Sequence, residues 1–180
     1  MAWLIHLNGA PGVGKSTVAQ RYADHHPGVL NLDIDRLVPL IGGWQEDFFG
    51  SLPAARNLAL AMASDHLARG TDVVMPQLVT AVDQATRFEA AAGHAGAAYV
   101  EIALHVEPHE QALRFRGKPE ASPVDRHVKQ YIEDKGGDAT LRRIRGHFLS
   151  YLTDRPLAQR LDTDGMDPDA TYDVLLAALH

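Results

Sequence analysis

Short apolar runs alternate along the chain with longer stretches in which apolar residues recur every three or four positions. The short runs predict buried strands, and the periodic stretches predict helices with one face against a core. The expected strands cover residues 3–8, 29–32, 71–76, 98–106 and 157–162. The expected helices cover residues 15–25, 53–69, 82–93, 108–116 and 169–179. This alternation predicts a doubly wound α/β fold with a parallel sheet.

A glycine-rich segment joins the first expected strand to the first expected helix. Its sequence, Gly9-Ala10-Pro11-Gly12-Val13-Gly14-Lys15-Ser16-Thr17, fits the phosphate-binding pattern G-x-x-x-x-G-K-[ST]. Glycines allow the backbone N–H groups to approach the β-phosphate closely, and the start of the helix adds its dipole. We expect Lys15 to reach the β- and γ-phosphate oxygens and the Ser16 hydroxyl to bind Mg²⁺. The segment therefore predicts a P-loop that binds a nucleotide with Mg²⁺.

Two aspartates follow the second expected strand. Asp33 and Asp35 lie where the carboxyl end of that strand meets the phosphate side of the sheet, so both should point toward the reacting end of the nucleotide. Alternatively, one of them only caps the short helix that begins near Arg36, a role that suits aspartate.

Residues 114–145 are locally basic. They hold nine basic and five acidic residues, a net charge of +4 in a chain whose net charge is −6. Glycines and prolines interrupt the segment, and we expect a lid that closes over phosphates. Arg114 and Arg116 are the candidates for clamping the transferring phosphoryl group. For the other cations of the segment, a solvated helix face is the preferred interpretation.

Composition indicates one globular domain over residues 1–180. The chain has no cysteine, which excludes disulfides and thiolate chemistry and is compatible with the cytoplasm. No apolar run approaches the roughly 18 residues of a membrane span. The acidic net charge argues against a large polyanion as the main partner.

With these features in place, the chain resembles the small P-loop kinases, such as chloramphenicol phosphotransferase, polynucleotide kinase, gluconate kinase and zeta-toxin-type kinases. The resemblance rests on the P-loop, the Asp33-x-Asp35 pair, the Arg114-x-Arg116 segment and the terminal Asp162-Thr163-Asp164-Gly165-Met166-Asp167-Pro168. It implies a P-loop NTPase fold with a five-stranded parallel sheet, ATP and Mg²⁺ as cofactors, and phosphoryl transfer to a hydroxyl.

The resemblance also implies roles for single residues. Asp35 matches the catalytic base and Arg116 a lid arginine, while the turn at 162–166, with Asp162 and Thr163, matches the loop that packs on adenine. A carboxylate suits proton removal in phosphoryl transfer. Asp33 is then expected to hold Mg²⁺ through water.

One feature departs from the family pattern. The third expected strand ends in Met75-Pro76-Gln77 without an aspartate, and Asp72 stands at its start, roughly 10–13 Å from the phosphate end. This absence argues against motor-type ATPases. For the acceptor, the candidates are Arg56 and Gln77, each of which is equally well a surface residue, and Trp44, which lies in a glycine-rich flap over residues 36–50.

The chain is therefore expected to transfer the γ-phosphoryl group of ATP, or of GTP, to a small hydroxyl-bearing molecule, as a monomer or homodimer. Two alternatives stay open: a nucleotide-dependent switch or binding module, and a kinase of nucleic-acid 5′-hydroxyl ends. A dinucleotide-binding oxidoreductase fits poorly, because the third glycine of its fingerprint is replaced by Thr17.

Overall fold

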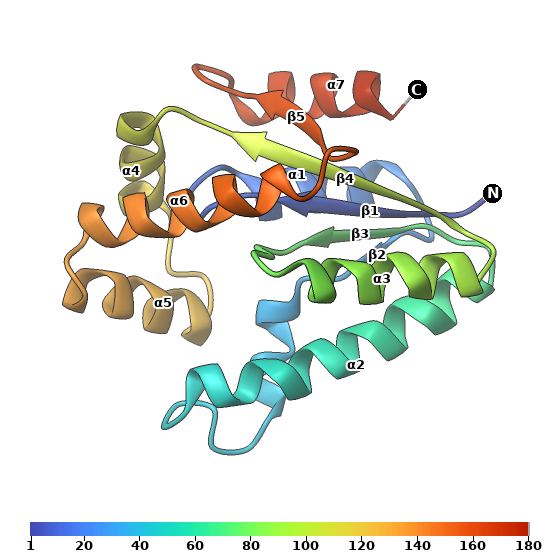
Figure 1. Cartoon of the computed structure of the whole chain (residues 1–180), viewed down its shortest axis with the longest axis horizontal. Helices are drawn as coiled ribbons and strands as arrows, with labels where there is room; N and C mark the ends of the chain where they lie inside the picture. The colour runs from blue at the N-terminus through green and yellow to red at the C-terminus, as the bar shows by residue number, and fades with distance from the viewer. Residues whose placement is uncertain (180) are drawn as a thin grey trace.

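The computed structural model describes residues 1–179 and contains, within them, a parallel sheet of five strands. The strands are β1 (Trp3–Asn8), β2 (Leu30–Asn31), β3 (Val73–Pro76), β4 (Ala98–His105) and β5 (Gln159–Asp162). Their order across the sheet is β2-β3-β1-β4-β5. All pairings are parallel, so the carboxyl ends of the strands meet at one end of the molecule (Figure 1). The expected α/β fold with a five-stranded parallel sheet is confirmed.

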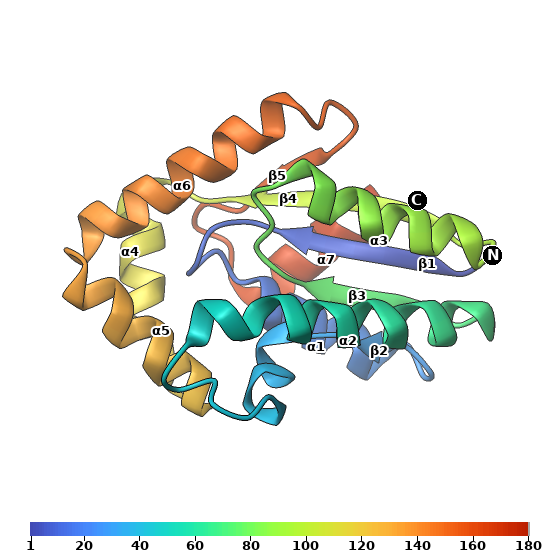
Figure 2. The same ribbon diagram turned by 60° about the horizontal axis from the view of Figure 1, so that its bottom comes forward.

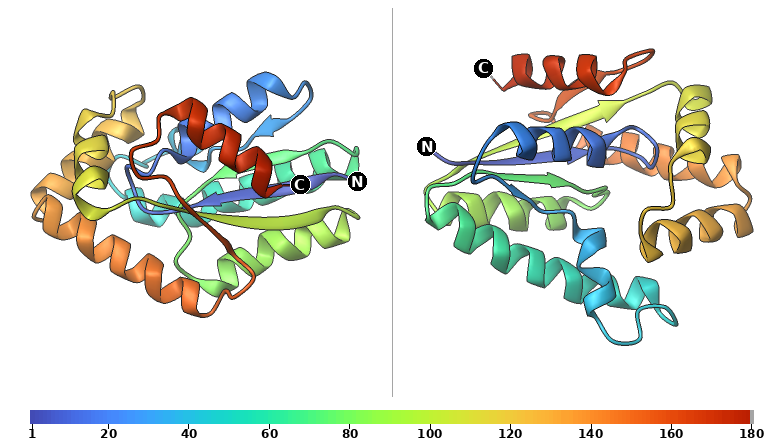
Figure 3. Two further views of the ribbon diagram at one scale, coloured as in Figure 1. Left: turned by 90° about the horizontal axis from the view of Figure 1, so that it is seen from above. Right: turned by 180° about the vertical axis from the view of Figure 1, so that it is seen from behind.

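Helices cover both faces of this sheet. One face carries α1 (Lys15–His25) and α7 (Pro168–Ala178), which pack on Ile5 and Leu7 of β1. The opposite face carries α2 (Phe48–Ala68) and α3 (Val82–His94), and the two layers are seen from above and behind in Figure 3. Because side chains alternate along a strand, Leu4 of β1 joins the core on the α2 and α3 side.

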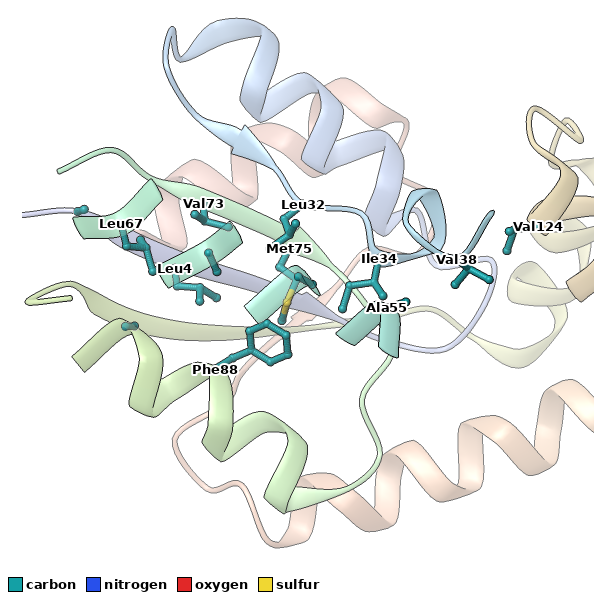
Figure 4. Packing of buried hydrophobic residues seen from close by; sticks show 14 of the residues in the cluster. Leu4, Leu32, Ile34, Val38, Ala55, Leu67, Val73, Met75, Phe88 and Val124 are labelled. Atoms are coloured by element: carbon teal, nitrogen blue, oxygen red, sulfur yellow. The ribbon is translucent and has the colours of Figure 1, made fainter. Parts of the chain in front are cut away.

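A hydrophobic core lies between the sheet and the helices α2 and α3, and it fixes the strands whose carboxyl ends meet at one end of the molecule. Leu4, Leu32 and Met75 are fully buried there, and Phe88 of α3 closes the layer (Figure 4). Burying a large apolar side chain contributes roughly 1.5–3 kcal/mol, so this layer fixes the strands whose ends carry the site.

The lid consists of helices beyond the carboxyl ends of the strands. They are α4 (Pro108–Gly117), α5 (Pro123–Asp134) and α6 (Asp138–Thr153), and α5 lies beside the beginning of α2 (Figure 2). The lid was expected to end at residue 145, but α6 continues past this point. Phe148 and Tyr151 in its last turns are buried against Ala103 of the sheet, so α6 belongs to the lid at one end and to the core at the other.

Helix α2 begins five residues before its expected start at Pro53. The Asp47 carboxylate accepts a hydrogen bond from the Gly50 N–H (2.8 Å) and caps the helix. Phe48 and Phe49 are therefore helical and do not belong to an irregular flap. The rest of that segment contains two short 3₁₀ turns, η1 (Ile34–Arg36) and η2 (Val38–Leu40). Pro53 resembled a first helical residue, but here it lies inside the helix.

Candidate active site

The glycine-rich segment forms a loop between β1 and α1. Gly12 has φ 90°, and a Cβ atom there would lie 2.7 Å from the Gln111 carbonyl oxygen of α4. Gly14, the N-cap of α1, has φ 97° with open space around it, so it is needed for its backbone conformation alone. The loop is thus held in an open curve with the first N–H groups of α1 at its rim.

Lys15 extends back across this loop. Its ammonium group donates hydrogen bonds to the carbonyl oxygens of Gly9 (2.7 Å) and Ala10 (3.1 Å). Burial lowers the pKa of Lys15 to about 8, while the carboxylate of Asp35 acts in the opposite direction. A partly buried cation whose hydrogen bonds go only to carbonyl oxygens is well placed to accept an anionic group.

A cavity of about 920 Å³ opens beside the loop at the carboxyl end of the sheet. This volume falls in the range of ligand pockets. Its walls come from the P-loop, η1, α2, the loop between β3 and α3, and the lid. The expected site residues that line it are Pro11, Gly12, Val13, Gly14, Lys15, Ser16, Thr17, Asp35, Arg56, Gln77 and Arg114.

Asp33 and Asp35 have different surroundings. The Asp33 carboxylate accepts a hydrogen bond from the Asp35 N–H (3.1 Å) and caps η1, which is the alternative role considered above. Asp33 does not line the cavity, whereas Asp35 does. Burial, and secondarily the neighbouring Asp33, raise the pKa of Asp35 to about 6. Of the pair, Asp35 is therefore the carboxylate that faces the cavity.

The two lid arginines differ in the same way. Arg114 lines the cavity, but its guanidinium pairs with Glu110 and donates to the carbonyl oxygens of Thr163 (2.9 Å) and Met166 (3.0 Å). It thereby ties α4 to the turn before α7. Arg116 pairs with Asp138 at the start of α6 (2.6 Å) and lies outside the cavity lining. In this arrangement Arg114 connects the lid to the turn before α7, and Arg116 connects two helices of the lid.

The turn after β5 contacts the cavity through residues other than those expected. The Asp162 carboxylate accepts hydrogen bonds from Arg160 (3.0 Å), and the Thr163 hydroxyl is buried and donates to the His105 carbonyl (3.3 Å). Neither residue lines the cavity, whereas Met166 and Pro168 do. The turn therefore presents an apolar surface.

Trp44 also lies elsewhere than expected. It is buried in the core between η2 and α2, with its ring edge toward His127 of α5 (centroids 5.8 Å apart). It does not line the main cavity. The cavity lining includes the aromatic rings of Phe48 and Phe49 of α2 and Tyr131 and His127 of α5, and also those of Phe115 and His147. Sequence reasoning missed the rings of α2 and α5 because the pairing of these helices is tertiary; two adjacent phenylalanines after a glycine-rich turn were the available signal.

Asn8 is a second residue that sequence reasoning missed. Its side-chain oxygen accepts from the N–H groups of Gly9 (2.8 Å) and Val79 (3.0 Å), and its amide donates to the Val79 carbonyl (3.0 Å) and to Glu101 (2.8 Å). The P-loop is thus tied to the loop between β3 and α3, which carries Gln77. A polar residue that ends an apolar strand was the signal.

Glu101 anchors this connection from β4. Its buried carboxylate accepts from Asn8, from the Tyr151 hydroxyl (2.8 Å) and from Arg155 (3.0 Å). A buried carboxylate requires such partners, since an unpaired one is costly. The lid helix α6, which carries Tyr151, is thereby joined to both loops.

Comparison with protein families decides where the chain belongs. A family described as an AAA domain matches residues 4–135, which include the P-loop, Asp35 and the start of the lid. The chain belongs to this family of P-loop kinases. The membership implies nucleotide binding. No curated protein sequence matches the chain significantly.

Solved structures of P-loop kinases share the fold. The tunicamycin resistance protein of Deinococcus radiodurans has a TM-score of 0.61 and 18% identity, with 99% of this chain and 96% of that chain covered. A gluconokinase from Sinorhizobium meliloti has a TM-score of 0.62 and 19% identity, with coverages of 97% and 90%. Deoxyadenosine kinase from M. mycoides has a TM-score of 0.56 and 12% identity, with coverages of 98% and 97%. The TM-scores show a shared fold, and at these low identities they show the fold alone.

Across residues 1–179, none of the helices combines the length and apolarity needed to cross a membrane.

Proposed function

We propose that this P-loop kinase transfers the γ-phosphoryl group of ATP to a hydroxyl of a small molecule, nucleoside or nucleotide. The observation that carries the proposal is that Asp35 lines the same cavity as Lys15 and Ser16 of the P-loop. The cavity therefore combines a phosphate-binding loop with the Asp35 carboxylate, which is able to accept a proton, whereas the other two carboxylates of its lining, Glu120 and Asp125, pair with Lys129 and Lys118.

In the proposed step the acceptor oxygen forms a bond to the γ-phosphorus, and the bond from that phosphorus to the β–γ bridging oxygen breaks. ADP leaves with the electron pair of that bond, and the proton of the hydroxyl moves to Asp35. A pKa of about 6 keeps Asp35 mostly ionised at pH 7 while making it a stronger base than an ordinary aspartate.

The P-loop residues bind and orient the nucleotide. Lys15 exchanges the carbonyl oxygens of Gly9 and Ala10 for β- and γ-phosphate oxygens, which removes the cost of its burial. GTP fits the same loop, because the loop contacts only phosphates. Met166 and Pro168 provide the apolar surface for the base, next to the predicted contacts of Asp162 and Thr163.

The residues present fit a Mg²⁺ ion that arrives with the nucleotide. Within residues 1–179, no three His, Cys, Asp or Glu side chains form a metal cluster, and Mg²⁺ typically needs only one or two protein ligands beside phosphates and water. Ser16, which lines the cavity, would hold it directly. Asp33 caps η1 and does not line the cavity, so it would reach the ion only through water. The bound ion neutralises phosphate charge during transfer.

Arg114 and Arg116 remain proposed phosphate contacts. Each would have to exchange a present partner for a phosphoryl oxygen when the lid closes. Arg114 is better placed for this role because it already lines the cavity.

The test is ADP formation from MgATP with a panel of nucleosides, sugars, antibiotics and oligonucleotides with free 5′-hydroxyls. One acceptor class is expected to accelerate turnover, and Asp35→Asn should lower that rate about 100- to 10,000-fold while nucleotide still binds. Asp65→Asn, on the exposed side of α2, is the matched control. An Asp35→Asn enzyme as fast as the wild type would remove the assignment of the base.

The alternatives give different results in the same experiment. A nucleotide-dependent switch hydrolyses ATP slowly and responds to no acceptor. A nucleic-acid kinase responds to oligonucleotides with a steep dependence on salt. Arg116, Lys118 and Lys129 of the lid already pair with carboxylates, which leaves fewer cations for a nucleic-acid backbone.

A further inference from the structure

Arg56 lines the cavity with a guanidinium group whose hydrogen-bonding capacity is not fully used. Its side chain comes from α2 and lines the cavity with Asp35. Its Nε atom is buried and has no hydrogen-bond partner within residues 1–179. Burial lowers the pKa of Arg56, and Asp35 and Asp83 act against that shift without forming a hydrogen bond to this nitrogen. A buried donor without a partner is costly, and a bound ligand can supply the missing acceptor.

The other lysine and arginine side chains of the cavity wall have partners. Lys15 binds P-loop carbonyls, Arg114 pairs with Glu110, Lys118 with Asp125, and Lys129 with Glu120. Arg56 is thus distinguished within the described cavity lining by its unsatisfied Nε. Its planar guanidinium matches the two oxygens of a carboxylate or phosphate.

The face of α2 that carries Arg56 also shows which side chains would contact a ligand bound to its guanidinium. Phe49, Leu52 and Arg56 are spaced at i, i+3 and i+7, so they share one face of the helix, and all three line the cavity. At 1.5 Å per residue the row extends about 10 Å along α2. Tyr131 of α5 lies across from Phe49, with ring centroids 5.0 Å apart. The row is apolar at one end and cationic at the other.

We propose that the acceptor is an alcohol that carries an oxyanion, a carboxylate or a phosphate group, which Arg56 binds while the hydroxyl faces Asp35. This inference rests on the proposed function and specifies its substrate class. The apolar part of the acceptor packs against Phe49 and Leu52. Arg56 selects the acceptor, and the transfer step itself uses Asp35 and Lys15.

The experiment compares acceptors that differ only in the oxyanion. One pair is para-(hydroxymethyl)benzoate and para-(hydroxymethyl)benzamide, and the other is thymidine 5′-monophosphate and 5′-O-methylthymidine, which both keep only the 3′-hydroxyl free. Binding is measured by calorimetry with Mg²⁺ and a non-hydrolysable ATP analogue, and turnover is measured separately with MgATP. In at least one pair the oxyanion member should bind about 10- to 100-fold more tightly, as expected for charge-assisted hydrogen bonds. The pair that shows it distinguishes carboxylate from phosphate.

Variants assign the effect to Arg56. Arg56→Gln should abolish the difference within the pair by raising the KM of the oxyanion member, with little change in kcat or in binding of the neutral member. Arg56→Lys should keep part of the preference. Arg69→Gln, at the other end of α2 in an exposed pair with Asp65, is the matched control. Arg56→Gln should fold normally, since Nε has no partner to lose.

The outcomes separate the two proposals. Equal affinity within both pairs, including no affinity for either member, or a preference that survives Arg56→Gln, overturns the role of Arg56. An Arg56-dependent preference in binding without turnover of any acceptor supports the oxyanion site and overturns the kinase activity. Turnover of neutral acceptors that is unaffected by Arg56→Gln supports the proposed kinase activity and overturns the proposal that the acceptor carries an oxyanion.

Discussion

His6 lies on β1 with a fully buried ring. Its Nε2–H donates to the Gln77 carbonyl (2.9 Å), so the neutral ring accepts from the Tyr99 hydroxyl at Nδ1 (2.8 Å). Burial lowers the pKa of His6. The nearby Glu101 carboxylate raises it by a smaller amount, and Arg155 and Lys15 lower it slightly further. The unfolded chain therefore binds a proton more readily than the folded one.

This difference predicts a pH dependence of stability. The unfolded chain takes up the His6 proton below about pH 6.5, so the contribution of His6 to the free energy of unfolding falls as the pH is lowered. The raised pKa of Asp35 gives a contribution of the opposite sign over the same range, so the effect of His6 is measured against a variant that lacks its imidazole. His6→Gln should flatten this slope by up to about 1.4 kcal/mol per pH unit between pH 5.5 and 6.5. Urea unfolding across this range measures the slope, with His94→Gln at the exposed end of α3 as the control. An unchanged slope would mean that the His6 ring is charged when buried.

The positions of site residues were predictable where local pattern sets them. The P-loop positions follow from glycine and lysine spacing, and the short separation of Asp33 and Asp35 placed both near the strand end. Which of the two faces the cavity depends on η1, where Asp33 turns back to cap the backbone. The unsatisfied Nε of Arg56 depends on burial among α2 and its neighbours, which the sequence of α2 alone does not contain.

At the scale of elements, Asn8 connects the P-loop to the loop between β3 and α3. Asn8→Ala should lower the free energy of unfolding by about 2–4 kcal/mol, because several buried partners lose their hydrogen bonds. Asn31→Ala is the matched control: the buried Oδ1 of Asn31 has no partner within residues 1–179, and its amide makes one hydrogen bond, to the Gln20 side chain (3.0 Å), so its loss should cost at most about 1 kcal/mol. Denaturant midpoints of the two variants measure the difference. Equal costs would show that the Asn8 connection contributes nothing beyond its own burial.

Elements themselves were predicted well wherever periodicity is local. The strands and the helices α1, α3, α4 and α7 lie within about two residues of their expected bounds, whereas α5 and α6 fall in the expected lid, for which no helix bounds were predicted. The start of α2 was wrong because Pro53 resembles a first helical residue, while the actual cap is Asp47. The continuation of α6 into the core could not be predicted from its basic sequence, since it depends on Phe148 and Tyr151 meeting the sheet.

At the scale of the whole molecule, the cavity is built from the sheet and the lid together, so it exists only in the folded chain. A nucleotide that binds in it should therefore stabilise the folded state. An Mg²⁺–nucleotide complex at 100 times its Kd should raise the free energy of unfolding by about 2.7 kcal/mol. Lys15→Ala should abolish this rise at the same concentration, and Lys135→Ala, exposed at the end of α5, should preserve it. Thermal unfolding with and without nucleotide measures both. A Lys15→Ala protein stabilised as much as the wild type would place the nucleotide elsewhere.

The central claim is that the γ-phosphoryl group reaches a hydroxyl and not water. The most direct measurement follows an isotopic label on the γ-phosphorus of ATP in the presence of the best acceptor from the panel. The account predicts that the label appears as a phosphate ester of that acceptor, in an amount equal to the ADP formed, and that Asp35→Asn abolishes the ester. If all of the label appears as inorganic phosphate, the chain hydrolyses ATP, and the transferase account is contradicted.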